Sequence, residues 1–242
     1  MTTVAAFGGF GGFGLFYGFD IYYLVLVIPA LLISLYAQAM VKKTFHTFSK
    51  TRAASGMTGY DAAKQIIDGY HLDDVKIERV RGELTDHFDP RTKVLRLSDS
   101  TYDSPSIAAI GVAAHEAGHA AQHHEGYLPN KFRGALFPVA RIGSQFGPFM
   151  AIFGIILAID PLINVGILLF FVAVMFYLIT LPVEFNASSR AIRVLEAQSI
   201  LNREELAGAR KVLRAAAMTY VASALMAIAN LLRLLLLSNR RR

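Results

Sequence analysis

The chain of 242 residues contains no cysteine, and charged residues make up only 17% of it. Without cysteine there are no disulfides and no thiolate metal ligands, so a metal site would have to use histidine and carboxylate side chains. The scarcity of charge, with 54% hydrophobic residues, is typical of a membrane protein. The formal charge is +6, but the basic residues lie beside apolar segments instead of forming a patch. We therefore expect a lipid bilayer as partner and no nucleic acid.

Four apolar segments are long enough to cross a bilayer, which predicts a mainly α-helical integral membrane protein. The Asp160-Pro161 turn signal divides one apolar region into a transmembrane hairpin. Arg233, near the end of the last segment, is expected to snorkel to the interface. The predicted divisions are a Gly/Phe-rich segment of unassigned role at 1–20, a span at 21–41, a polar domain at 42–141, the hairpin at 142–182, ligand-bearing and connecting helices at 183–216, and a span with a basic tail at 217–242.

Lysine and arginine positions predict the orientation of these spans. No basic residue precedes Lys42, and the hairpin tip carries only Asp160. The positive-inside rule therefore puts the regions 42–141 and 183–216 on the cytoplasmic side of a bacterial cell membrane, in a multi-pass arrangement. The arginine tail at 240–242 disagrees, because four spans would leave it outside.

The polar domain is expected to combine helices with short strands. An amphipathic helix starts near residues 57–61 and ends near Gly69, and two strands are predicted at 75–80 and 93–97, with a turn at 87–92. The second strand directly precedes the motif helix described next. It could receive an extended peptide substrate, or it could be half of a small hairpin that caps the domain.

The most informative stretch is His115-Glu116-Ala117-Gly118-His119. Histidines four apart on a helix face the same way, so both imidazoles can reach one metal ion. Glu116 is then placed to take a proton from the attacking water, as in the H-E-x-x-H zincin pattern. Ser104-Pro105 predicts the start of a helix over 105–124, and Gly126 its stop. The competing interpretation is a pair of hydrogen-bonded core histidines with Glu116 on a solvated edge.

A third ligand is needed, since catalytic zinc usually has three protein ligands and one open position. His123 continues along the same helix about 12 Å beyond His115 and cannot meet the same ion. Glu184, at the end of the third span, is the better candidate because a lone carboxylate at a membrane-helix end is costly without a partner. An interface-facing carboxylate or a salt bridge to Arg190 are the alternatives.

The chain resembles the YugP-type bacterial membrane zinc metallopeptidases over about residues 20 to 237. The resemblance rests on the motif with its following Ala120-Ala121-Gln122-His123, on residues 182–188 and on residues 86–98. More distantly it is similar to the HtpX-type membrane gluzincins, where an acidic residue usually follows the ligand glutamate by four positions. This chain has Ser188 there, which argues against a carboxylate partner for the histidines.

Together these features predict a small α+β zincin-like domain and a zinc-dependent endopeptidase. His115, His119 and Glu184 would hold Zn²⁺, and Glu116 would act as general base and then general acid. Expected substrates are membrane proteins or juxtamembrane segments, whereas the oligomeric state stays open. Tyr220, His87, Arg190 and Tyr102 are candidate oxyanion donors. The alternatives are a zinc-clamped membrane scaffold or chaperone and, last, a transporter.

Overall fold

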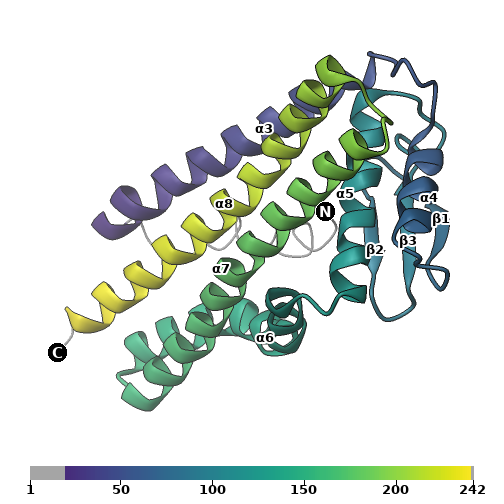
Figure 1. Ribbon diagram of the computed structural model, residues 1–242. Helices are drawn as coiled ribbons and strands as arrows, with labels where there is room; N and C mark the ends of the chain where they lie inside the picture. Colours follow the sequence, from purple (N-terminus) through teal and green to yellow (C-terminus); the bar gives the residue numbers. More distant parts are fainter. Residues whose placement is uncertain (1–19, 241–242) are drawn as a thin grey trace. The chain divides into compact units, whose positions relative to one another are not determined.

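The computed structural model describes residues 20–240, so the predicted Gly/Phe-rich segment, apart from Asp20, and Arg241–Arg242 lie outside the described residues. The described chain is mainly helical with one small sheet, as expected (Figure 1). It forms two compact units. The sheet-bearing unit comprises residues 38–127 and 183–218. The helical unit comprises residues 20–37, 128–182 and 219–240.

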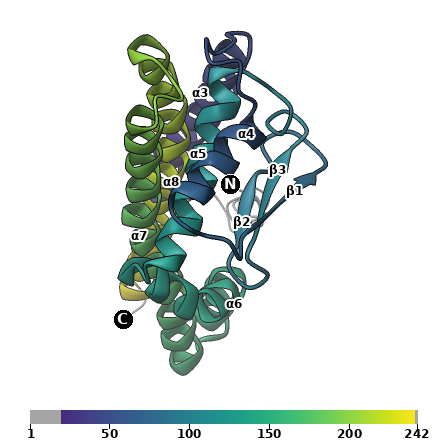
Figure 2. The same ribbon diagram turned by 45° about the vertical axis from the view of Figure 1, so that its right-hand side comes forward.

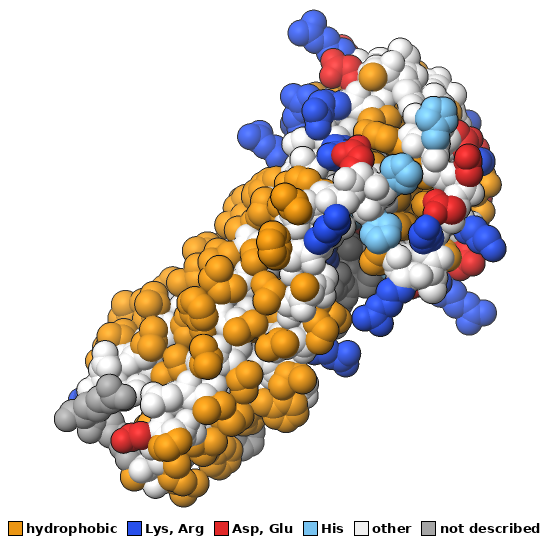
Figure 3. All heavy atoms as spheres, turned by 60° about the horizontal axis from the view of Figure 1, so that its bottom comes forward, with side chains coloured by type: hydrophobic (Ala, Val, Ile, Leu, Met, Phe, Trp, Pro, Cys, Tyr) orange, Lys and Arg blue, Asp and Glu red, His pale blue; other side chains and the backbone are white. Residues whose placement is uncertain are grey.

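Four helices are long and apolar enough to cross a membrane, which agrees with the expected number of spans. They are a helix that starts as the π-helical turn η2 (Tyr23–Val27) and continues as α3 (Ile28–Ser49), α6 (Leu128–Leu157), α7 (Asp160–Ala197) and α8 (Arg203–Asn239). Hydrophobic side chains cover the visible surface of the helical unit, whereas charged and histidine side chains gather on the sheet-bearing unit (Figure 3). This apolar surface is suited to a hydrocarbon solvent.

These helices extend beyond the apolar segments. The hairpin turns at Ala158 and Ile159, next to the predicted Asp160-Pro161 signal. Pro182 lies inside α7, which runs on to Ala197. Glu184 therefore lies within a continuous helix, not at a helix end. A proline removes one backbone donor but need not end a long helix whose flanks are well packed.

The expectation that Arg233 snorkels to the interface is wrong. Its side chain is buried and donates from Nε and Nη2 to Asp20 Oδ2 at 2.9 and 2.6 Å. The guanidinium also lies over the ring of Tyr23, 5.1 Å from its centroid. Asp20 supplies a carboxylate within the helical unit, so the charge is neutralised there and need not reach water.

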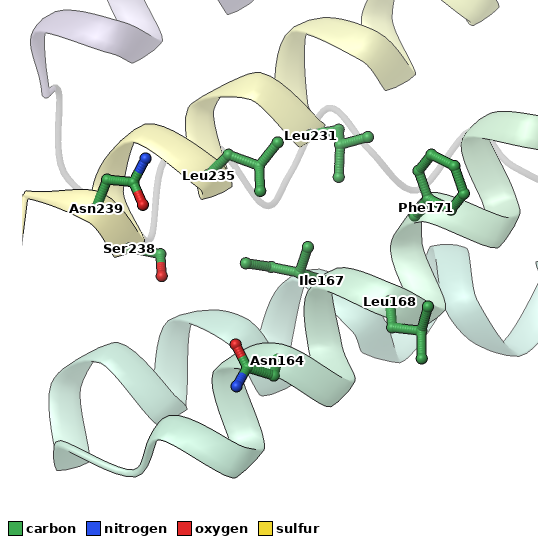
Figure 4. A pocket seen from close by; sticks show the side chains of 8 residues that line it. All are labelled: Asn164, Ile167, Leu168, Phe171, Leu231, Leu235, Ser238 and Asn239. Carbon is green, nitrogen blue, oxygen red and sulfur yellow. The ribbon is translucent and has the colours of Figure 1, made fainter. Parts of the chain in front are cut away.

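A groove of about 350 Å³ lies in the helical unit between the start of α7 and the end of α8. Figure 4 shows Asn164, Ser238 and Asn239 at one end of it and Phe171 and Leu231 at the other. All the residues that line the groove belong to the helical unit, and none of them is a predicted metal ligand.

In the sheet-bearing unit, helix α4 (Gly59–Gly69) agrees with the predicted amphipathic helix. Thr58 and Asp61 form a capping box at its start, which satisfies backbone donors that the first turn leaves open. Its buried face carries Ala62, Ala63, Ile66 and Ile67. This face packs against the motif helix α5 (Ile107–His124), and both helices contact the three-stranded sheet (Figure 2).

The sheet corrects two predictions. Residues 87–89 form strand β2 (His87–Asp89), where a turn is predicted, and the turn follows at 90–93. The two predicted strands, β1 (Lys76–Val80) and β3 (Val94–Ser98), pair in parallel and so do not form a hairpin. The reversal takes place between β2 and β3, which pair antiparallel. The strand order β1-β3-β2 makes β3 central, with buried residues on both faces.

Helix α5 begins two residues later than its sequence predicts. Ser106, not Ser104, is the N-cap, and its hydroxyl accepts from Ala109 N. The carbonyl of Pro105 instead accepts from Ala53 N, and Ser106 forms a β-bridge with Arg52, so this stretch stays extended. The helix ends as expected before Gly126, whose φ of +66° suits glycine.

Candidate metal centre

His115 and His119 occupy successive turns of α5, and both face the same neighbour. Their rings meet edge to face with centroids 4.7 Å apart. His115 is buried and His119 is nearly so, in a helix that is apolar and buried on almost every side. Glu116 is buried too, which excludes the solvated edge of the competing interpretation.

Glu184 of α7 completes the group. Its Oε2 lies 3.3 Å from His115 Nε2 and 3.5 Å from His119 Nε2, and its side chain is only 2% exposed. Gly118 allows this approach, because a Cβ there would lie 2.9 Å from the carbonyl oxygen of Ala187. The glycine inside the motif thus lets α7 come close enough to bring its carboxylate to the histidines.

The three donor atoms fit a zinc ion. One ligand atom from each of His115, His119 and Glu184 lies within 4.8 Å of the others. Among residues 20–240, these three side chains form the group that could hold a metal ion. Tetrahedral ligands at about 2.0–2.1 Å from zinc stand roughly 3.3–3.4 Å apart. The two measured separations of 3.3 and 3.5 Å match this spacing. Two imidazoles and a carboxylate are also a common donor set of catalytic zinc.

Gln122 fixes which nitrogen of His119 faces the group. Its Nε2 donates to the carbonyl oxygen of Val183 and to Asn186 Oδ1, both at 2.9 Å. A backbone carbonyl can only accept, so the amide cannot be turned round, and Gln122 Oε1 must accept from His119 Nδ1–H at 3.0 Å. In the neutral imidazole, Nε2 then directs a lone pair at the Glu184 carboxylate. Two acceptors at this distance repel one another unless a proton or a metal cation lies between them.

Ser188 has the corresponding place beside His115. Its Oγ lies 3.2 Å from His115 Nδ1, so the imidazole Nε2 is directed at Glu184. Ser188 lies one turn beyond Glu184 on α7, at the position where the HtpX-type pattern has an acid. Both histidines are thus oriented by neutral groups, a hydroxyl and an amide. Such partners fix ring orientation but raise imidazole basicity less than a carboxylate does.

Glu116 lies under the edge of the sheet. The backbone N–H of Phe88 in β2 donates to Glu116 Oε2 at 3.2 Å. The start of β2 is held by Asp86, a fully buried carboxylate that accepts from Ser98 N and Ser98 Oγ at 2.8 and 2.9 Å. Burial raises the pKa of Asp86, and the charge of Glu116 raises it further. These contacts place a strand directly beside the motif glutamate.

Other predicted residues lie elsewhere. His123 and His124 are exposed at the end of α5, and His123 is not part of the group. Arg190 donates to Glu125 Oε1 at 2.7 Å and to Asn186 Oδ1, so the alternative of a Glu184–Arg190 salt bridge is wrong.

The structure gives the following contacts for the candidate oxyanion donors. His87 Nδ1 lies 2.8 Å from the Thr85 carbonyl, Tyr102 stacks near Tyr60 and Arg79, and Tyr220 is buried on α8 in the helical unit. Sequence reasoning missed the roles of Gln122 and of the Phe88 amide. Gln122 follows His119 by three residues, a helical spacing that could have indicated it, whereas a backbone donor leaves no signal.

Comparisons with known proteins identify the family of this chain. The model of a family described as "putative neutral zinc metallopeptidase" matches residues 23–239. The protein named "Putative membrane protease YugP" of Bacillus subtilis (strain 168) is 47% identical over 215 residues, which cover 89% of this chain and 96% of that protein. No solved structure matches significantly. The extent of both matches shows that this membrane chain belongs to the YugP-type family of zinc metallopeptidases.

Proposed function

We propose that this protein is a membrane-embedded, zinc-dependent endopeptidase with a gluzincin-type site in a zincin-like domain. His115, His119 and Glu184 hold the zinc ion, and Glu116 is the general base. The observation that carries the proposal is the convergence of His115, His119 and Glu184, whose ligand atoms lie within 4.8 Å of one another. The tautomer imposed by Gln122 leaves His119 Nε2 facing the Glu184 carboxylate, an arrangement that a metal cation stabilises.

When bound, zinc supplies Lewis-acid chemistry: it polarises the scissile carbonyl and makes water acidic enough to attack near neutral pH. Glu116 takes the proton from the attacking water while the water oxygen bonds to the carbonyl carbon. The C–N bond then breaks, and Glu116 gives the proton to the leaving amine nitrogen. The Phe88 N–H holds one carboxylate oxygen of Glu116 and so orients the base. Three protein ligands would leave one zinc position open, as catalysis requires and a purely structural clamp does not.

The substrate peptide is expected to lie along β2. The central strand β3 has partners on both sides, so it cannot accept a further strand. Among the described strands β2 pairs with β3 alone, and its Phe88 amide faces away from β3, toward Glu116. An extended peptide added at this edge would gain backbone hydrogen bonds and pass the general base.

Membrane and juxtamembrane proteins are the proposed substrates, and the cytoplasm is the proposed side. Glu184 lies two residues beyond Pro182, the end of the apolar hairpin region, on the same continuous helix. A site built on this part of α7 is expected near the membrane surface. Lys42, Lys43 and the basic residues of 183–216 lie on that side by the positive-inside rule.

Glu116→Gln tests the proposal. Cleavage of casein or of an unfolded membrane protein by the purified enzyme should fall about 10²–10⁴-fold, since a general base contributes this much. Zinc content should stay at the wild-type level because Glu116 is not a ligand. Glu125→Gln is the matched control: this carboxylate lies on α5's C-terminal cap and pairs with Arg190, so its variant should keep full activity. Full activity of Glu116→Gln, or chelator-resistant cleavage by the wild type, would refute the proposal.

A further inference from the structure

A second cleft lies in the sheet-bearing unit, beside the C-terminal end of α5. Its volume is about 180 Å³. It is lined by residues from the loop after α4, from the turn before β3 and from α5: Leu72, Asp74, Val75, Lys93, Ala120, His123 and His124. None of these residues belongs to the metal centre.

We propose that this cleft is a specificity subsite that takes the carboxylate side chain of a substrate aspartate or glutamate. The proposal rests on the proposed peptidase function and names the substrate feature that the same site would select.

Phe88 connects the cleft to the metal centre. Its backbone N–H holds Glu116, while its ring packs against His123, with centroids 5.9 Å apart. Ala120 and His124 follow Glu116 by one and two helical turns, or about 6 and 12 Å along α5. An extended peptide covers this distance in roughly two to four residues. A peptide on the β2 edge would therefore bring a side chain near the scissile bond to the cleft.

The cleft has an apolar floor and a polar rim. Leu72 and Ala120 are each 1% exposed and Val75 is half-buried, so the floor suits the methylene groups of a side chain. His123 and His124 are exposed at the rim. Such a combination fits a side chain with a short hydrocarbon stem and a polar end.

The charges at the rim favour an acid over a base. Lys93 pairs with Asp74, and this pair is about half exposed. Its hydrogen bond with Lys93 holds the pKa of Asp74 below its ordinary value, so Asp74 is charged. Lys93 has three donor hydrogens, and each imidazole adds a further donor. Nearby Glu125 is neutralised by Arg190. An incoming carboxylate thus meets the Lys93 ammonium and the imidazole donors. An incoming ammonium is repelled by Lys93 and attracted by Asp74 and the imidazole acceptors.

The test uses neutral carrier peptides that place a single Glu, Gln or Lys at each position up to four residues from the scissile bond. At one of these positions the wild type should cleave the Glu peptide about five- to tenfold faster in kcat/KM than the Gln peptide, and the Lys peptide more slowly still. Lys93→Met should abolish the Glu preference and shift it toward Lys, because Asp74 is left alone at the rim. The matched control is Lys64→Met, since Lys64 forms a similar exposed pair with Asp68 on α4 and should leave all ratios unchanged.

Zinc content, measured on the same samples, separates the two proposals. Unchanged Glu/Gln/Lys ratios in a zinc-loaded, active Lys93→Met enzyme would overturn the subsite and leave the peptidase intact. Failure of the zinc-loaded wild type to cleave any peptide or protein would overturn both.

Discussion

Buried charge is handled differently in the two units of this protein. In the helical unit, Arg233 and Asp20 form a complete pair, with two guanidinium donors on one carboxylate oxygen. In the sheet-bearing unit, Glu184 faces the Nε2 atoms of His115 and His119, whose Nδ1 atoms are already engaged by Ser188 and Gln122. The first arrangement matches donors with acceptors. The second brings two imidazole nitrogens and a carboxylate together around one point.

This difference distinguishes a structural pair from the proposed metal site. A buried pair with matched donors and acceptors needs no further ligand. Two imidazoles and a carboxylate around one point form a donor set that suits a dication with three protein ligands. Burial alone would not have distinguished the two, because Arg233 and Glu184 are 4% and 2% exposed.

The largest effect on zinc binding is expected at Glu184. Glu184→Gln keeps the shape of the side chain but removes the charge that is proposed to bind the cation. We expect zinc affinity to fall more than about 100-fold, beyond the 10–100-fold typical of partners that only orient a ligand. Elemental analysis after dialysis against a weak chelator measures it.

The control for Glu184 is Glu205→Gln. Glu205 is another buried carboxylate of the same unit, but it accepts from the backbone N–H groups of Ala54 and Asn202. This variant should lose stability and keep its zinc. Equal metal loss in both variants would show that Glu184 acts through folding and not as a ligand.

For the Arg233–Asp20 pair we expect a loss of stability without a loss of zinc. Arg233→Ala leaves the Asp20 carboxylate in the helical unit without its guanidinium, which should lower the free energy of unfolding by about 3 kcal/mol. The double variant Asp20→Asn, Arg233→Met should recover most of that loss and keep zinc binding. Denaturant unfolding in detergent micelles measures these energies. Loss of zinc in the Arg233 variants would contradict the conclusion that this pair has no part in metal binding.

A smaller effect is expected at Gln122, which accepts from His119 Nδ1–H and so leaves Nε2 of the neutral ring as an acceptor. Gln122→Ala should lower zinc affinity about 10–100-fold, because the ring loses its fixed orientation. Gln122→Glu should restore most of the affinity, as a carboxylate also accepts from Nδ1–H. Chelator competition gives the affinities, and the visible spectrum of the cobalt-substituted protein reports the coordination geometry. Wild-type values for both variants would remove Gln122 from the site.

The smallest expected effect concerns Asp86. Its pKa is raised by burial, so its ionised form opposes folding above the folded-state pKa, and this cost disappears as the pH falls toward its ordinary pKa of 3.8. Asp86→Asn should therefore be stabilised relative to the wild type at pH 7, and the advantage should shrink toward pH 4. Parallel stability profiles of the two proteins would show that Asp86 carries no such penalty.

Much of the site follows from local spacing. His115 and His119 lie on one face because a helix repeats every 3.6 residues. The amphipathic pattern of α4 likewise predicts a helix with one buried face. Glu184 could be found because a carboxylate beside an apolar segment needs a partner. Strand β2 was missed because three residues before a proline carry too little pattern. The central place of β3 depends on pairing between strands, which alternation within one strand does not reveal.

The apolar helices, the helical spacing of the imidazoles and the absence of thiolate ligands can all be predicted from the amino-acid sequence, because they depend on composition and on neighbours along the chain. Which side chains contact one another becomes clear only in the folded protein. These contacts are Arg233 with Asp20, Ser188 and Gln122 with the imidazoles, and the Phe88 amide with Glu116. Such contacts join residues far apart in the chain, and a hydrogen bond needs an approach of about 3 Å that no local periodicity encodes.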